Sequence, residues 1–290
     1  MKKLLLLLLV LLAQCSGFLF AQSQITPQPI NVMSYNIRMD NAGDGDNQWK
    51  FRKEFAANLV KFHEADLIGM QEVLHNQLMD MASRLPDYGY IGVGREDGRT
   101  KGEYASIFYN KKRFKVIDSG NFWLSEDCDA VGKKGWDAAC ERVATWGVFE
   151  DKSTGKRLFM LNTHLDHMGK VARHEGALLV INKVKELSRN YPVIVTGDFN
   201  AVPTDDPIQV LTNSPEGYSL TDTRSVSPLV YGPNWSFHDF GRVKMAERSL
   251  IDYIFIKGNI KVMRYGVLTD MLNTLYPSDH CPVLSTLIIH

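Results

Sequence analysis

The stretch Val193-Ile194-Val195-Thr196-Gly197-Asp198-Phe199-Asn200 is an apolar run that ends in a carboxylate and a carboxamide. Val and Ile favour a buried strand, and Gly197 permits a turn or a close backbone approach. Asp198 and Asn200 are two residues apart, so they share a direction if the extended conformation continues. Gly-Asp-x-Asn is also a common turn sequence. The stretch therefore predicts either a plain turn or a catalytic strand end, and the rest of the chain decides between them.

Strand-like and helix-like segments follow one another along the whole chain without strict alternation. Apolar runs rich in β-branched and aromatic residues predict strands at 30–36, 66–72, 105–109, 114–124, 143–149, 157–162, 193–196, 250–256, 260–268 and 283–289. Apolar residues at helical spacing predict helices at 51–64, 74–85 and 171–189. This mixture predicts an α/β fold in which two packed sheets are flanked by helices.

The first 21 residues are typical of a secretory signal peptide. The basic start Met1-Lys2-Lys3 precedes the apolar run 4–13, and Ala21 is a small residue suited to cleavage. We therefore expect an exported protein, periplasmic or extracellular, whose mature chain starts near Gln22. Cys15 leaves lipid anchoring as a minor alternative, because the residue before it is bulkier than the one usual before a lipidated cysteine.

Residues 22–290 are expected to form one domain, since no Gly/Ser-rich or Pro-rich linker and no fixed-period repeat divides them. No stretch after the signal is apolar enough for a transmembrane helix. Lysine plus arginine number 33, as do aspartate plus glutamate, so the net charge of zero provides no general attraction to a long polyanion. The balance favours small or short substrates, and we expect a monomer without an obligate protein partner.

Three cysteines follow the signal: Cys128, Cys140 and Cys281. Export permits disulfides, and a bridge between Cys128 and Cys140 could staple the loop-like stretch 129–139. Sequence does not supply the Cα separation that a bridge requires, so the bridged and the free forms both stay open. The spacing matches no paired zinc-binding pattern, so no structural zinc is expected.

Polar residues with complementary chemistry stand at the ends of several predicted strands. Asp252 is informative because an acid between Ile251 and Tyr253 would be costly if it were buried without a partner. Carboxylate and carboxamide oxygens suit a hard divalent cation, while imidazoles can donate to phosphate oxygens. Taken singly, each residue also fits a turn, a cap or a loop. The set comprises Asn36, Glu72, His164, Asp198, Asn200, Asp252, Asp279 and His280.

The order of these residues resembles that of one enzyme family. The motifs are Ser34-Tyr35-Asn36-Ile37, Met70-Gln71-Glu72-Val73, Asn162-Thr163-His164-Leu165, Gly197-Asp198-Phe199-Asn200, Ile251-Asp252-Tyr253-Ile254-Phe255 and Ser278-Asp279-His280. Together they are similar to the endonuclease/exonuclease/phosphatase superfamily, which includes pancreatic deoxyribonuclease, abasic-site endonucleases, sphingomyelinases, inositol-phosphate 5-phosphatases and nocturnin-like deadenylases. The resemblance spans nearly the whole mature chain. It implies a four-layered α/β sandwich of two packed mixed β-sheets flanked by helices, with the site at one end.

By this resemblance, Glu72 is the main metal ligand, and Asn36 and Asp279 complete or support a site for Mg²⁺ or Mn²⁺. One departure bears on that metal site. Abasic-site endonucleases carry an acid two residues after the asparagine, where this chain has Arg38. The motifs are nearer in style to nocturnin-like deadenylases, although export argues against cytoplasmic messenger RNA as the substrate.

The resemblance implies catalytic roles for five further residues. Asp198 would orient or deprotonate the attacking water, and Asn200 would hold water and phosphate. His164 and His280 would stabilise the transition state, while Asp252 would orient His280. These roles agree with general chemistry, because a metal ion and hydrogen-bond donors offset the growing negative charge on phosphate while a positioned carboxylate activates the nucleophile.

Substrate contacts are expected between the middle strands. Arg142 could clamp a phosphate, Trp123 could stack on a base or a sugar, and Tyr109 could donate to a phosphate. The alternatives are that Arg142 pairs with a nearby acid and that Trp123 belongs to the core.

Three functional hypotheses follow. The first is a secreted, divalent-metal-dependent phosphodiesterase of the nuclease or exonuclease type, acting on a nucleic acid or a nucleotide. The second keeps the chemistry but takes a phospholipid, as sphingomyelinases do, or a sugar or inositol phosphate. The third is a catalytically silent binding module, which the intact set of acid, amide and imidazole residues disfavours.

Overall fold

The computed structural model describes residues 28–213 and 217–290. The expected signal peptide, its cleavage point near Gln22 and Cys15 all lie outside the described residues. Within residues 28–213 and 217–290, no helix combines the length and the apolar character needed to cross a lipid bilayer.

One half of the structure is a seven-stranded mixed sheet. Its strands are β1 Ile30–Asn36, β2 Leu67–Val73, β3 Tyr88–Ile91, β4 Tyr104–Asn110, β10 Val230–Tyr231, β12 Ile260–Val267 and β13 Val283–Ile289. They lie in the spatial order β10-β12-β13-β1-β2-β4-β3. The central strands β1 and β2 are parallel, and β1 pairs antiparallel with β13 on its other side.

The other half is a six-stranded mixed sheet. Its strands are β5 Phe114–Trp123, β6 Val143–Asp151, β7 Arg157–His164, β8 Val193–Asp198, β9 Thr221–Asp222 and β11 Asp252–Lys257. Their spatial order is β5-β6-β7-β8-β11-β9. Strands β7 and β8 are parallel, and β11 runs antiparallel to β8. The stretch 193–198 therefore forms the central strand β8, which lies between β7 and β11.

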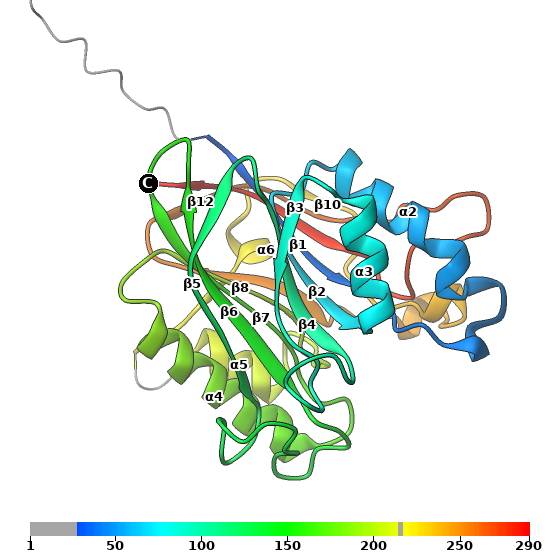
Figure 1. The fold of residues 1–290 in the computed structure, drawn as a ribbon, viewed down its shortest axis with the longest axis horizontal. Helices are drawn as coiled ribbons and strands as arrows, with labels where there is room; N and C mark the ends of the chain where they lie inside the picture. Colours follow the sequence, from blue (N-terminus) through cyan, green and yellow to red (C-terminus); the bar gives the residue numbers. More distant parts are fainter. Residues whose placement is uncertain (1–27, 214–216) are drawn as a thin grey trace, which may run out of the picture.

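Helices cover the outer face of each sheet. Helices α2 (Trp49–Phe62) and α3 (His75–Arg84) pack on the seven-stranded sheet, whereas α4 (Lys170–Leu187) packs on the six-stranded sheet beside α5 (Asp206–Thr212) (Figure 1). Helix α4 buries Ala177, Val180, Ile181 and Val184, whose spacing places them on one face. Helix, sheet, sheet and helix form four layers, which confirms the predicted fold class.

The sequence prediction missed the shortest elements. It located every strand of four or more residues except β3, and all three long helices, within a few residues of their observed ends. It missed α5, the edge strands β9 and β10, the single-turn helix α6 (Thr223–Val226), and the 3₁₀ helices Ala42–Asn47, Asp239–Gly241 and Met245–Glu247. Elements this short contain too few residues to show a hydrophobic period.

The three cysteines in the described part of the chain are free thiols. The Cys128 Sγ lies toward the Asp129 carboxylate at 3.9 Å, and the Cys140 Sγ lies 3.7 Å from Asp166 Oδ2. The structure therefore resolves the alternative left open by the sequence in favour of free thiols at both positions.

Strand alternation decides which residues of β1 face the second sheet. Ile30 and Val32 belong to the core between the sheets, whereas Met33 and Tyr35 pack in the core that contains α2 and α3. Ser34 accordingly faces the second sheet, where its Oγ accepts a hydrogen bond from the Gly197 amide at 3.1 Å. The same alternation directs the last residue of the strand, Asn36, toward the end of the space between the sheets.

A buried polar cluster joins the two sheets just behind that end. The Asn162 amide of β7 donates to the backbone carbonyls of Met70 (2.9 Å) and Ser106 (3.0 Å) in the opposite sheet. Its Oδ1 accepts from Gln71 Nε2 (2.7 Å) and from Thr196 Oγ1 (3.0 Å). All of these side chains are fully buried, so each unmade hydrogen bond would carry the full cost of desolvation.

Gly69 of β2 is expected to be indispensable to this contact. A Cβ atom at residue 69 would overlap Thr196 Oγ1 and Asn162 Oδ1 across the two sheets. We expect Gly69→Ala to lower the free energy of unfolding by about 1–3 kcal/mol, the usual cost of overpacking a core. Urea denaturation monitored by tryptophan fluorescence would measure it.

Gly266→Ala in β12 is the matched control, because a Cβ atom there has no neighbour closer than 3.8 Å. Equal midpoints for the two variants would show that the sheets do not approach each other in this way.

Candidate active site

The strands of both sheets end around one cleft of about 720 Å³. Strands β1, β2, β7 and β8 reach it with their carboxyl ends, and the antiparallel β11 begins there. Asn36 and Asp252 lie just behind its wall. The predicted residues that line it are Glu72, Arg142, His164, Asp198, Asn200, Asp279 and His280. The structure therefore brings the eight polar strand-end residues together.

Three of these residues lie side by side because of strand register. Asp198 at the end of β8 is directly opposite His164 of β7 and Asp252 of β11. The His164 Nε2 is 3.4 Å from Asp198 Oδ2. Asn200 then turns back: its backbone amide donates to Asp198 Oδ1, and its side-chain amide lies 3.0 Å from His164 Nε2. Asp198 and Asn200, the polar end of the stretch 193–200, are thus a fixed part of the cleft.

The opposite sheet contributes Asn36 and Glu72. The Asn36 Nδ2 donates to Glu72 Oε1 at 3.0 Å and to Asp198 Oδ2 at 2.9 Å. Its Oδ1 accepts from the backbone amide of Arg38 at 3.0 Å. In this orientation Asn36 connects two carboxylates as a hydrogen-bond donor, while its oxygen, the atom that would bind a metal ion, is engaged elsewhere.

Four residues that line the cleft adopt a left-handed backbone. Arg38, Glu72, Asn200 and Asp239 have φ angles of 57°, 60°, 47° and 48°. Such angles are uncommon outside glycine and cluster at functional sites. At Glu72 the pairing of β2 with β4 is irregular, and strict alternation would direct this side chain away from Gln71, which points into the space between the sheets. The left-handed residue redirects the Glu72 carboxylate into the cleft.

A hydrogen-bond chain runs from the cleft into the core. The His280 Nδ1 lies 2.8 Å from Asp252 Oδ2, and the same oxygen accepts from Ser236 Oγ at 2.6 Å. Ser236 in turn accepts from the backbone amide of Asp252 at 3.1 Å. Because an ionised carboxylate only accepts, the His280 Nδ1 carries a proton and its Nε2 faces the cleft beside Asn36.

Burial and charge push the pKa values of these groups apart. Burial, followed by the Asp252 charge, raises the pKa of Asp198 to about 7. Burial also lowers the pKa of His164 well below its ordinary value, assisted by the charges of Arg142 and Arg95. Burial opposes a charge on His280 too, but Asp252, together with the charges of Asp198 and Asp279, outweighs it and raises the pKa of His280 well above its ordinary value. One histidine is therefore neutral and the other cationic near pH 7.

Acidic and histidine side chains in the cleft could hold a metal ion. Glu72, His164 and Asp198 each offer a ligand atom within 4.8 Å of the others, as do Asp198, Asp252 and His280. Carboxylate oxygens are suited to hard divalent cations, so the donor set around Glu72 and Asp198 fits such an ion. His280 is a poorer ligand, since its raised pKa keeps both ring nitrogens protonated.

Asp279 lies farther from this group than the sequence predicted. In the described part of the chain it joins none of the clusters that could hold a metal ion. Arg38 stands between the acids instead, with Nη1 3.9 Å from Glu72 Oε2 and Nε 3.8 Å from Asp279 Oδ2. The arginine that departs from the abasic-site pattern thus contributes a fixed positive charge next to the expected ligands.

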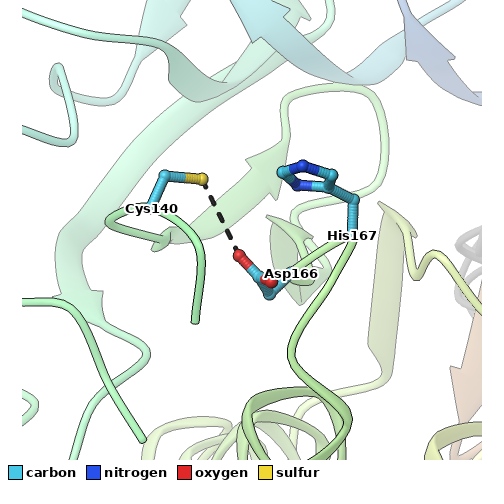
Figure 2. Close-up of side chains that lie close together, drawn as sticks. All are labelled: Cys140, Asp166 and His167. Carbon is cyan, nitrogen blue, oxygen red and sulfur yellow. Dashed lines mark hydrogen bonds between the residues drawn. The ribbon is translucent and has the colours of Figure 1, made fainter. Parts of the chain in front are cut away.

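Arg142 lies in the cleft wall and is tightly held. Its Nε is 3.4 Å from Asp166 Oδ2, and its Nη2 is 2.9 Å from His167 Nδ1. Cys140, Asp166 and His167 lie close together (Figure 2) and also have ligand atoms within 4.8 Å of one another. The Arg142 guanidinium already contacts the Asp166 carboxylate and the His167 imidazole nitrogen. These side chains are therefore better suited to holding Arg142 in place than to binding a metal ion.

Two residues expected to touch substrate do not line the cleft. Tyr109 packs against Phe149 in the core, with ring centroids 5.5 Å apart. Trp123 is 5% exposed, packs with Ala105 and Val143, and donates through Nε1 to the Arg95 carbonyl at 2.6 Å. The sequence shows the aromatic residue type but not which face of its strand carries it, so both are corrected to packing residues.

Several residues at the site carried no sequence signal. Arg95 and Glu103, from the loop before β4, line the cleft. Arg52 is fully buried on α2 and donates to the carbonyls of Ile37 (2.8 Å) and Pro277 (2.9 Å), which ties the end of β1 to the segment before Asp279. An arginine in a helix is normally predicted to be exposed, so the burial of Arg52 could be recognised only from the fold.

Comparison with known sequences now decides the family. The pattern of the Endonuclease/Exonuclease/phosphatase family matches residues 33–280. The chain belongs to this family. The predicted resemblance is thereby confirmed, and members of the endonuclease/exonuclease/phosphatase family are hydrolases that act on phosphate esters and depend on divalent metal ions.

Solved structures of the family include similar proteins from Bacteroides. A family member from Bacteroides vulgatus is 42% identical, with a TM-score of 0.87 over 91% of this chain and 100% of the other. A mannosyl-6-phosphatase from Bacteroides thetaiotaomicron is 41% identical, with a TM-score of 0.84 over 90% of this chain and 100% of the other.

A curated relative is more distant. Human nocturnin is 26% identical over 88% of this chain but only 64% of its own length. The chain spans 50%, 64% and 39% of the length of three curated relatives that it matches. Similarity to these longer proteins therefore describes the shared domain and not their full activity.

Asp252 is expected to be the group that keeps His280 protonated. In metal-free protein, Asp252→Asn removes the largest of the charges that oppose burial, so the pKa of His280 should fall from its raised value toward or below 6.5. Imidazole ¹⁵N shifts, followed by NMR during a pH titration, would measure the change.

Asp222→Asn is the matched control, since it neutralises a half-buried acid on β9, opposite Phe255 of β11 and away from His280. A His280 ring that is already neutral at pH 7 in the unaltered protein would contradict the assignment.

Proposed function

We propose that this protein is a phosphomonoesterase that hydrolyses sugar phosphates with the help of Mg²⁺ or Mn²⁺. The charge pattern of the cleft carries this proposal. The residues that line it include three arginines and no lysine, against six acids: Glu72, Glu103, Asp198, Asp205, Asp239 and Asp279. A polynucleotide-binding site needs a positively charged groove with aromatic side chains on which bases can stack. An acid-rich pocket instead suits one phosphate on a body of hydroxyl groups.

The size of the cleft supports a small substrate. A volume of about 720 Å³ lies within the range of small-molecule sites, which bury most of their ligand. Phe237 is the one aromatic side chain among the lining residues of the described chain, so stacking of successive bases has no platform. The 41% identity to a mannosyl-6-phosphatase over its full length supports the same substrate class.

The arrangement of side chains suits hydrolysis by an activated water. Asp198, whose pKa is raised to about 7, is suited to take a proton from water near neutral pH. Cationic His280 directs Nε2 into the cleft, where it would donate to a phosphoryl oxygen, and the Asn200 amide would hold the phosphate or the water. A divalent cation bound at Glu72 would neutralise charge on the phosphoryl group.

The alternative of a nuclease or nucleotide phosphodiesterase rests on the curated relatives, which include nocturnin and RNA exonucleases at 23–28% identity. A phospholipid substrate has weaker support, because the mannosyl-6-phosphatase, nocturnin and the RNA exonucleases are not named for lipid substrates. These substrates are the outcomes that compete with the proposal.

A substrate panel tests the proposal directly. Purified residues 22–290 are expected to release inorganic phosphate from mannose 6-phosphate and glucose 6-phosphate with Mg²⁺ or Mn²⁺, and to lose activity with EDTA. Asp198→Ala should lower kcat by roughly a hundredfold or more, the scale for loss of a general base. Asp118→Ala is the control, since Asp118 pairs with Arg189 on the surface, outside the cleft.

Faster cleavage of oligonucleotides, NADP⁺ or sphingomyelin in the same panel would replace the sugar-phosphate proposal. Full activity with chelator would contradict the metal requirement alone.

We also propose that the protein is exported. The basic start, the apolar run 4–13 and Ala21 support removal of residues 1–21. When the full chain is expressed in a bacterial host, mass spectrometry of the released protein should find Gln22 at the N-terminus. A cytoplasmic protein that retains Met1 would overturn export, and a lipid on Cys15 would replace cleavage at Ala21.

A further inference from the structure

A small recess adjoins the cleft, and unsatisfied polar atoms surround it. The recess has a volume of about 10 Å³, and its polar walls are Arg95, Glu103, Arg142 and His164, which all line the main cleft as well. Arg95 Nε, Arg142 Nη1 and His164 Nδ1 are buried without a hydrogen-bond partner. Buried polar atoms normally have partners, so three orphans around one recess point to a ligand group.

The Arg142 guanidinium is positioned before any ligand arrives. Asp166 holds its Nε, and His167 holds its Nη2 at 2.9 Å. Asp166 is itself fixed by the backbone amides of Met168 and Gly169, at 2.9 and 2.8 Å. Arg142 is only 4% exposed. Two of its nitrogens are therefore engaged, and the third, Nη1, has no partner among the described residues, although Arg142 lines the recess.

The opposite wall is equally rigid. Arg95 donates through Nη1 to Glu103 Oε2 at 2.7 Å, and its backbone carbonyl accepts from the buried Trp123 indole. The side chains of Arg95 and Glu103 are 15% and 12% exposed. Trp123 thus holds the backbone of Arg95 in place on the side away from the recess.

Charge balance decides what kind of group fits. Arg142 is paired with Asp166 and Arg95 with Glu103, so the recess has no excess positive charge to attract a free anion. A hydroxyl group both accepts and donates hydrogen bonds. It can accept from the free guanidinium N–H groups and donate to the Glu103 carboxylate. The volume admits about one water-sized group, which is the size of a hydroxyl but not of a phosphate.

We propose that Arg95, Glu103 and Arg142 form a hydroxyl-reading subsite that selects the sugar part of the substrate. This inference rests on the proposed function, and it makes these residues specificity determinants outside the bond-breaking step. A site built to bond a hydroxyl discriminates strongly against an analogue that lacks it, because its own buried polar groups are then left unpaired.

The test crosses enzyme variants with substrate analogues. Wild-type protein is assayed with mannose 6-phosphate and with its monodeoxy analogues at each ring position. One analogue should lose roughly ten- to a hundredfold in kcat/KM, the scale of a hydrogen bond to a charged group. Glu103→Gln and Arg142→Lys should lower kcat/KM for mannose 6-phosphate to a similar extent, and the sensitive analogue should lose little more in these variants.

Glu150→Gln is the matched control, because Glu150 pairs with Arg157 at 2.9 Å away from the cleft. It should leave the whole series unchanged. Thermal melts would confirm that the variants fold, and the wild-type analogue series can still overturn the subsite if a variant does not.

Equal kcat/KM for all monodeoxy analogues would overturn the subsite while the proposed function stands. Fully additive losses in the variants and the analogues would also overturn it, because the residues and the hydroxyl would then act independently. If no sugar phosphate is hydrolysed while p-nitrophenyl phosphate is, the substrate class and the subsite both fail.

Discussion

The amide of Asn162, buried between the sheets, is the contact on which the geometry of the site depends. It donates to backbone carbonyls of the seven-stranded sheet and accepts from Gln71 of that sheet and Thr196 of its own. Gly69 makes room for it. Asn36 and Glu72 come from one sheet and His164 and Asp198 from the other, so the hydrogen bonds of Asn36 across the cleft require the sheets to keep this relative position. Apolar packing alone would permit several positions, because it is not directional.

Positive and negative side chains offset one another in the cleft between the two sheets. Glu72, Asp198 and Asp252 lie close together, and the cationic His280 and the neighbouring Arg38 offset negative charge among them. Burial and the Asp252 charge raise the pKa of Asp198, while the Asp252 carboxylate lies beside the His280 imidazole. The raised pKa of Asp198 thus follows from its neighbours and not from its residue type.

The sequence predicted which strand-end residues meet, because strand alternation and register are regular. Once β1, β7, β8 and β11 are placed in two sheets, Asn36, His164, Asp198 and Asp252 must meet at one end. Glu72 meets them for a reason that no pattern shows, namely its left-handed backbone. The metal assignments were less secure, since Arg38 separates Asp279 from the group and Asn36 presents its nitrogen. The aromatic contacts failed because Trp123 and Tyr109 point into cores. Arg95 and Glu103 could not be predicted, because their place in the cleft depends on the conformation of the loop before β4.

The strand-end residues of the cleft and the residues around the recess have different origins. Asn36, His164, Asp198 and Asp252 belong to strands of the two central sheets, whereas Arg95 and Glu103 come from the connection between β3 and β4, and Arg142 from the connection between β5 and β6. Connections between strands tolerate insertions and exchanges that sheets do not. The fold can therefore acquire a new preference by replacing two surface segments while its hydrolytic apparatus stays intact. Grafting those segments between relatives is a practical route to enzymes with altered selectivity.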